Sequence, residues 1–180
     1  MAESVSRQEI EKYLKLAEQK IIVWDNLYAN DYCPRRLFLG PWSGRGTAGS
    51  VLLNPTGMVH TDCLLLDIMA ATIRQQAANS AWRTVLEAHQ VPEQFYAIAE
   101  YFCHPVFNSR QWQSNDSASQ EQFDAIEHLL WRWKTPLSRE WYPFIMSLKH
   151  DLLINAGQLP ELRIQKTQSP ALAEHLLSQD

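Results

Sequence analysis

The chain has 180 residues, of which 46% are hydrophobic and 20% are charged, and its formal net charge is −4. This length is typical of a single domain with a substantial core, so we expect one globular domain over residues 1–180. The negative net charge excludes a global attraction to nucleic acid or to an anionic membrane. Three widely spaced cysteines do not make a disulfide framework, and we expect a cytoplasmic protein.

Residues 1–30 are predicted to form a long amphipathic helix. Ser6 and Glu9 make a capping-box pattern at its start, and we expect the helix to end near Asn30. Apolar residues recur at helical spacing along one face, and they are Ile10, Tyr13, Leu14, Ala17, Ile21, Trp24 and Leu27.

Residues 35–60 are predicted to form a β-hairpin unit rich in glycine and arginine. The short apolar stretches 36–39 and 50–53 are typical of strands, and 58–60 is typical of a returning strand. Glycines between the first two stretches favour irregular backbone. The sequence Asn54-Pro55-Thr56-Gly57 is a strong turn signal. The sequence therefore predicts a small antiparallel hairpin or three-stranded sheet.

Residues 61–180 are predicted to form a helical body. The helix expected from Thr61 to about Ala78 is apolar almost all round, which indicates a central, buried position. Further helices are expected at 81–89, from Pro92, from Ser117 or Ser119, and over 138–155 and 171–178. The predicted fold class is therefore mainly α (α+β), with about six or seven helices packed around the small antiparallel unit.

The loop rich in arginine and glycine is the candidate binding site. Free backbone amides beside arginines can hold an anion, and loop tryptophans are typical of interfaces. Gly44 to Val51 also resemble the phosphate-covering loop of protein kinases, but the lysine needed on the next strand is absent. The alternative interpretation is structural, in which the glycines only let the chain turn. The residues expected to bind are Arg35, Arg36, Trp42, Gly44, Arg45, Gly46, Thr47 and Trp112.

No metal site and no cofactor are predicted from the sequence. Strong zinc signals come as paired cysteine or histidine spacings, and the potential ligands here are scattered. They are Cys33, His60, Cys63, Cys103 and His104.

These observations predict a non-catalytic binding or regulatory subunit that acts through the loop on a protein partner. Nucleic acid is a possible partner only through the local basic loop, no membrane partner is expected, and the oligomeric state is left open. The alternative is a small enzyme acting on a nucleotide or other phosphate compound, with the glycine-rich loop as an anion cradle. Asp62, Asp151 or His60 would then supply acid–base or metal-binding groups.

Overall fold

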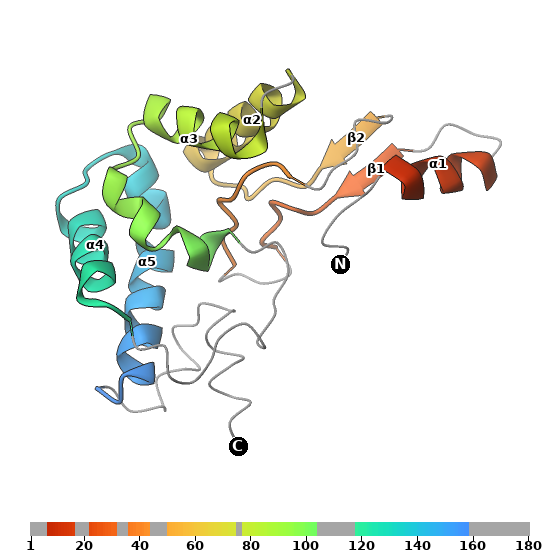
Figure 1. The fold of residues 1–180 in the computed structure, drawn as a ribbon. Coiled ribbons are helices and arrows are strands. Elements are labelled where there is room, and N and C mark those ends of the chain that lie inside the picture. Colours follow the sequence, from red (N-terminus) through yellow and green to blue (C-terminus); the bar gives the residue numbers. More distant parts are fainter. Residues whose placement is uncertain are drawn as a thin grey trace.

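The chain is mainly helical with a small β element (Figure 1). The computed structural model describes residues 7–16, 22–31, 36–43, 50–74, 77–103 and 118–158. None of the helices in these ranges is long and apolar enough to cross a membrane. In chain order, the elements within these ranges are α1 (Arg7–Leu16), β1 (Ile22–Asp25), β2 (Ser50–Leu53), α2 (Val59–Ile73), α3 (Ala78–Ala88), the 3-10 helices η1 (Glu93–Ala97) and η2 (Ala99–Phe102), α4 (Gln120–Trp131) and α5 (Pro136–Asn155).

The predicted mainly helical class is confirmed, but its details need correction. The described residues hold five α-helices rather than six or seven. The stretch from Pro92 to Phe102 forms two short 3-10 helices instead of one α-helix. The helix expected over 171–178 lies outside the described residues.

The sheet is parallel, so the predicted antiparallel hairpin was wrong. β1 and β2 pair with Ile22 opposite Ser50 and Asp25 opposite Leu53. The first strand lies inside the stretch that we expected to be helical. Parallel strands require a long connection, so a short hairpin turn could not have joined them. Residues 37–39 are buried, Arg36 is half-buried, and this stretch is irregular rather than a strand. Residues 59–60 already belong to α2.

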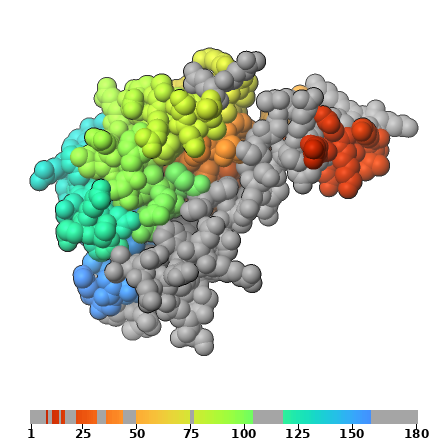
Figure 2. Space-filling model, in the orientation of Figure 1, coloured from red at the N-terminus to blue at the C-terminus, as the bar shows by residue number. Residues whose placement is uncertain are grey.

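The predicted helix over residues 1–30 is interrupted. α1 ends at Leu16 and β1 begins at Ile22. Ile22 and Val23 are β-branched residues, which fit a strand better than a helix. Trp24 is 65% exposed whereas Leu27 is 2% exposed, so these two side chains do not share one buried helix face. Figures 1 and 2 show α1 apart from the helical body formed by α2 to α5.

Aromatic side chains form the centre of the helical body. The ring of Trp141 on α5 lies 5.2 Å from that of Phe95 and 5.3 Å from that of Trp133, measured between centroids. All three residues are buried. Such large rings contribute much of the apolar area that stabilises a domain of this size.

The segment that follows β1 is anchored in the same core. Leu27, Phe38 and Leu39 are buried. The Leu39 N–H donates to the carbonyl of Phe102, and the Trp82 indole N–H donates to the carbonyl of Leu39, both over 2.7 Å. This irregular segment therefore joins the sheet to the helical body.

The beginning of α2 is fixed by a carboxylate from α5. Glu140 accepts hydrogen bonds from the backbone N–H groups of His60 (3.0 Å) and Thr61 (2.8 Å), and from the Thr61 hydroxyl (2.6 Å). The Trp141 indole N–H also donates to that hydroxyl over 2.9 Å. A negative charge at a helix N-terminus is favourable, so α2 and the turn before it are held against α5.

Candidate functional site at the carboxyl ends of the strands

The carboxyl ends of β1 and β2 bring two polar segments together. Just beyond the strands, the backbone N–H of Asn54 donates to the carbonyl of Asp25 over 3.1 Å. The side-chain amide of Asn54 donates to the carboxylate of Asp31, also over 3.1 Å. Ligand-binding groups of α/β proteins gather at the carboxyl ends of parallel strands. The Asp31–Asn54 pair is therefore the candidate functional site.

The loop that presents Asp31 is held by hydrogen bonds along its length. The buried Asp25 carboxylate accepts from the Leu27 N–H over 2.9 Å. The Arg36 guanidinium donates to the carbonyl of Leu27 over 2.7 Å and to the carbonyl of Ala29. Arginine suits this role because its rigid fork donates to two acceptors at once. The carboxylate of Asp31 is thus presented by a fixed segment, whereas that of Asp25 stabilises the turn.

The site offers both hydrogen-bond donors and hydrogen-bond acceptors. Asp31 is exposed and Asn54 is half-buried. The Trp24 indole N–H donates to the side-chain oxygen of Asn26 over 2.9 Å. A carboxylate accepts hydrogen bonds and an amide both donates and accepts them, whereas the carboxylate repels an anion. This chemistry fits a neutral ligand rich in hydroxyl groups.

Asp62, an acid–base candidate from the sequence, has a structural role. Its carboxylate accepts from the Thr56 N–H (2.8 Å), the Thr56 hydroxyl (2.7 Å) and the Gly57 N–H (3.0 Å). These bonds close the turn after β2, where Gly57 has a φ of 80°. The segment that the sequence predicted as a turn therefore leads into α2 rather than into a returning strand.

Two of the residues expected to bind a ligand, Arg36 and Trp42, make contacts within the protein. The Arg36 guanidinium is bonded to carbonyls as described above and lies 5.8 Å from the centroid of the Phe38 ring. Trp42 is 6% exposed, and its ring lies 5.6 Å from that of Tyr28. The other predicted binding residues lie outside the described residues, and they are Arg35, Gly44, Arg45, Gly46, Thr47 and Trp112.

The scattered metal-ligand candidates do not come together in the part of the chain that the structure describes. In that part, no group of three or more histidine, cysteine, aspartate or glutamate side chains could hold a metal ion. Cys63 is exposed on α2, whereas burial raises the pKa of the Cys103 thiol from 9.0 to about 12. Cys33 and His104 lie outside the described residues. Of the two remaining acid–base candidates, Asp151 is fully buried in α5 and His60 is exposed at the start of α2.

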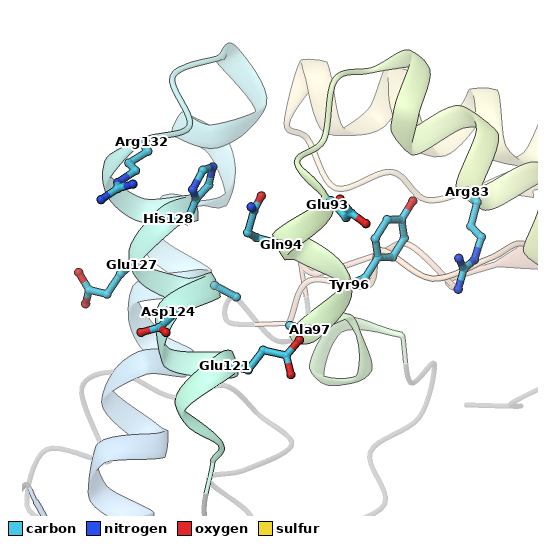
Figure 3. Close-up of a pocket in the computed structure, with 11 residues that line it drawn as sticks. Arg83, Glu93, Gln94, Tyr96, Ala97, Glu121, Asp124, Glu127, His128 and Arg132 are labelled. Atoms are coloured by element: carbon cyan, nitrogen blue, oxygen red, sulfur yellow. The ribbon is translucent and has the colours of Figure 1, made fainter.

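A concave region lies between η1 and α4 (Figure 3) and has a volume of about 920 Å³. Three of its charged groups interact within the protein. Glu127 pairs with Lys149, Gln120 donates to Asp124, and Arg83 lies over the ring of Tyr96. Ten of its eleven lining residues come after residue 87, so this cleft is separate from the strand-end site.

Comparison with a protein family concerns residues 1–87, which include the strand-end site. Residues 1–87 match the family described as NAGidase, beta-N-acetylglucosaminidase. A stretch of 60 residues is 38% identical to protein O-GlcNAcase of Rattus norvegicus and, equally, of Mus musculus. It covers 31% of this chain and 7% of each relative, so the chain spans a small part of the relatives' length.

This similarity overturns the predicted function. A regulatory subunit and a nucleotide- or phosphate-acting enzyme were both wrong, because the region that carries the glycine-rich loop is similar to a glycosidase. Anion binding by that loop has no support either. The guanidinium of Arg36 donates hydrogen bonds to backbone carbonyls of the protein itself, and the ring of Trp42 is buried in the core.

The residues of the strand-end site were missed for a local reason. Trp24 and Leu27 fit the apolar spacing of a helix, which concealed the strand Ile22–Asp25. The available signal for the strand and its end was a β-branched run followed directly by polar residues. Asn26 follows the strand immediately. Asn54 was interpreted only as a turn residue, although its side chain also reaches Asp31.

Proposed function

We propose that the Asp31–Asn54 pair binds the N-acetylglucosamine unit of a substrate, as part of a β-N-acetylglucosaminidase site. The position of the pair carries this proposal, because it lies at the carboxyl ends of two parallel strands within the residues that match that family. The names of the relatives, protein O-GlcNAcase, support the same sugar.

The chemistry of the pair assigns each side chain a role. The exposed Asp31 carboxylate accepts hydrogen bonds from sugar hydroxyls, and bonds to an ionised acceptor are stronger than neutral ones. Asn54 donates to that carboxylate and holds it in place. The side chain of Asn26 adds an amide that is itself oriented by Trp24.

Hydrolysis requires more carboxyl groups than this pair supplies. Glycosidases use two carboxyl groups, which lie roughly 5–10 Å apart on either side of the bond that is cleaved. Within the described strand-end region, the carboxylates of Asp25 and Asp62 are occupied by backbone N–H groups. We therefore assign Asp31 to sugar binding, and we assign the general acid and base to polypeptide outside the described residues.

Calorimetric titration of the full chain with N-acetylglucosamine tests the proposal. We expect saturable binding by the wild type, and binding weaker by about 10- to 100-fold in Asp31→Asn, since a hydrogen bond to a charged group contributes about 1.5–3 kcal/mol. Asp67→Asn is the matched control, because Asp67 is an exposed aspartate on α2 that pairs with His89. Undetectable binding by the wild type, or equal binding by Asp31→Asn, would contradict the proposal.

A further inference from the structure

Residues 131–143, which we call the α4–α5 corner, join two helices that lie side by side (Figure 1). In the part of the described chain that follows residue 87, Trp131 and Tyr142 are the only exposed large hydrophobic residues, and they are 50% and 38% exposed. Trp131 ends α4, and Tyr142 lies in the second turn of α5. Their ring centroids are 6.0 Å apart, so the two helices contribute to one aromatic surface.

The core of the helical body does not use these two rings. It takes the neighbouring residues Trp133 and Trp141, which are buried, whereas Trp131 and Tyr142 pack edge-to-face against each other in solvent. Tryptophan, tyrosine and arginine are the residue types that contribute most of the binding energy at protein interfaces. The exposed pair therefore has the composition of a docking surface.

Cationic side chains flank the two rings. Arg132 and Lys134 directly follow α4, and Arg139 lies one turn before Tyr142 on the same side of α5. All three cations are exposed. None of them forms an ion pair within the described residues, so their charges are available to a partner.

The corner is positive although the whole chain has a formal net charge of −4. Its one acidic residue is Glu140, whose carboxylate already accepts hydrogen bonds from the start of α2. The nearest carboxylates of α4 are not at the corner. Asp124 precedes Trp131 by two turns, roughly 10 Å along the helix axis, and Glu127 pairs with Lys149.

We propose that the α4–α5 corner docks an acidic peptide segment of a partner protein. An apolar side chain of that segment packs against the rings of Trp131 and Tyr142, and its carboxylates lie at the surrounding cations. Charge complementarity selects an acidic partner, and the rings supply the apolar anchor. The inference does not depend on the proposed function, because the corner lies outside residues 1–87 and outside the strand-end site.

The arrangement of the rings favours a peptide over single-stranded nucleic acid. Proteins that bind single strands stack successive bases on aromatic faces along a positively charged groove. Here the planes of Trp131 and Tyr142 meet at 71°, so they do not offer parallel faces to successive bases. The negative net charge of the chain also disfavours a polyanion, whereas a short acidic segment meets only the local charge.

Fluorescence anisotropy of labelled peptides tests the inference with the full chain. The probe is fluorescein-labelled EEEFEEE, and the comparison peptide QQQFQQQ keeps the ring and lacks the charges. We expect saturable binding of the acidic peptide and about tenfold weaker binding of the glutamine peptide, since three exposed ion pairs are lost. The difference between the two peptides should shrink at high salt, because salt screens exposed charges.

Variants of the corner locate the binding. Trp131→Ala and Arg139→Glu should each weaken the binding of EEEFEEE by about tenfold or more, because the first removes an anchor and the second reverses a charge. Tyr13→Ala and Arg74→Glu are the matched controls and should bind as the wild type does. Tyr13 is exposed on α1, and Arg74 follows the end of α2 that lies roughly 20 Å from its contact with Glu140.

Far-UV circular dichroism checks that each variant is folded, and Arg139→Glu keeps the test decisive if Trp131→Ala is not. Absence of binding by the wild type, equal affinity for the two peptides, or equal binding by Arg139→Glu would overturn the inference. A labelled oligothymidine that binds more tightly than EEEFEEE and is released by Trp131→Ala would also overturn it, since the corner would then be a nucleic-acid site.

Discussion

Replacing Arg36 tests whether this cation holds the loop that presents Asp31. Its guanidinium donates two hydrogen bonds, to the carbonyls of Leu27 and Ala29. Hydrogen bonds to a charged group contribute about 1.5–3 kcal/mol each. Because the guanidinium is only partly buried, we take the lower value for each bond and expect Arg36→Ala to lower the free energy of unfolding by about 3 kcal/mol. For a chain of this size, that loss corresponds to about 9 °C in melting temperature.

Urea denaturation followed by tryptophan fluorescence measures the effect of these Arg36 variants. Arg36→Lys should lower the free energy of unfolding by about half as much as Arg36→Ala, because an ammonium group lacks the planar fork that donates to both carbonyls. Arg132→Ala, an exposed position on the helical body, should remain within about 0.5 kcal/mol of the wild type. An Arg36→Ala variant as stable as the wild type would refute the structural role and leave Arg36 available for a ligand.

Four further predictions concern the stability of the fold and the reactivity of its cysteines. Glu140→Ala should lower the free energy of unfolding by about 3 kcal/mol, because three hydrogen bonds at the start of α2 are lost. Urea denaturation measures this loss and should show almost no change for the control Glu87→Ala, which replaces an exposed glutamate. Equal losses in the two variants would argue against the role of Glu140 as a cap of α2. At about pH 8, iodoacetamide should modify Cys63 and spare Cys103, whose pKa burial raises to about 12; peptide mass mapping that finds equal modification would contradict this. Since the unfolded chain releases the Cys103 proton at a lower pH than the folded chain, the contribution of this thiol to stability should fall as the pH rises above 9.0. Gly57→Ala should lower the free energy of unfolding by about 1 kcal/mol through backbone strain alone, because φ is +80° and no atom lies within 4 Å of an added Cβ. A variant that is more stable than the wild type in the same urea assay would exclude such strain.

The helices were predictable where their signals are local. Ser119 begins α4 with a reciprocal capping box to Gln122, and Ser119 was one of the two starts expected from the sequence. The last described helix ends at Asn155, followed by Gly157 at a φ of 69°, as its stop signal indicated. Caps and stop signals act over three or four residues, so these two could be recognised in one sequence, whereas α3 begins at Ala78, three residues before its expected start.

The sheet and the site depend on contacts between distant residues, which the sequence does not reveal. Val23 pairs with Val51, and this parallel register is set by packing and by a long connection rather than by a turn. Asn54 and Asp31 are 23 residues apart and meet only because their strands are neighbours. Arg36 resembled a free cation in the sequence, because its acceptors are backbone carbonyls that any residue could supply.

The side-chain amide of Asn54 offers the most direct test of sugar binding at the strand ends. Its signals in a ¹⁵N-labelled chain can be identified from their loss in Asn54→Ala and followed during titration with N-acetylglucosamine. We predict a saturable shift of these signals in the wild type and a much weaker response in Asp31→Asn. If the sugar shifts other signals and leaves those of Asn54 unmoved, the ligand binds elsewhere and the assignment of this site is wrong.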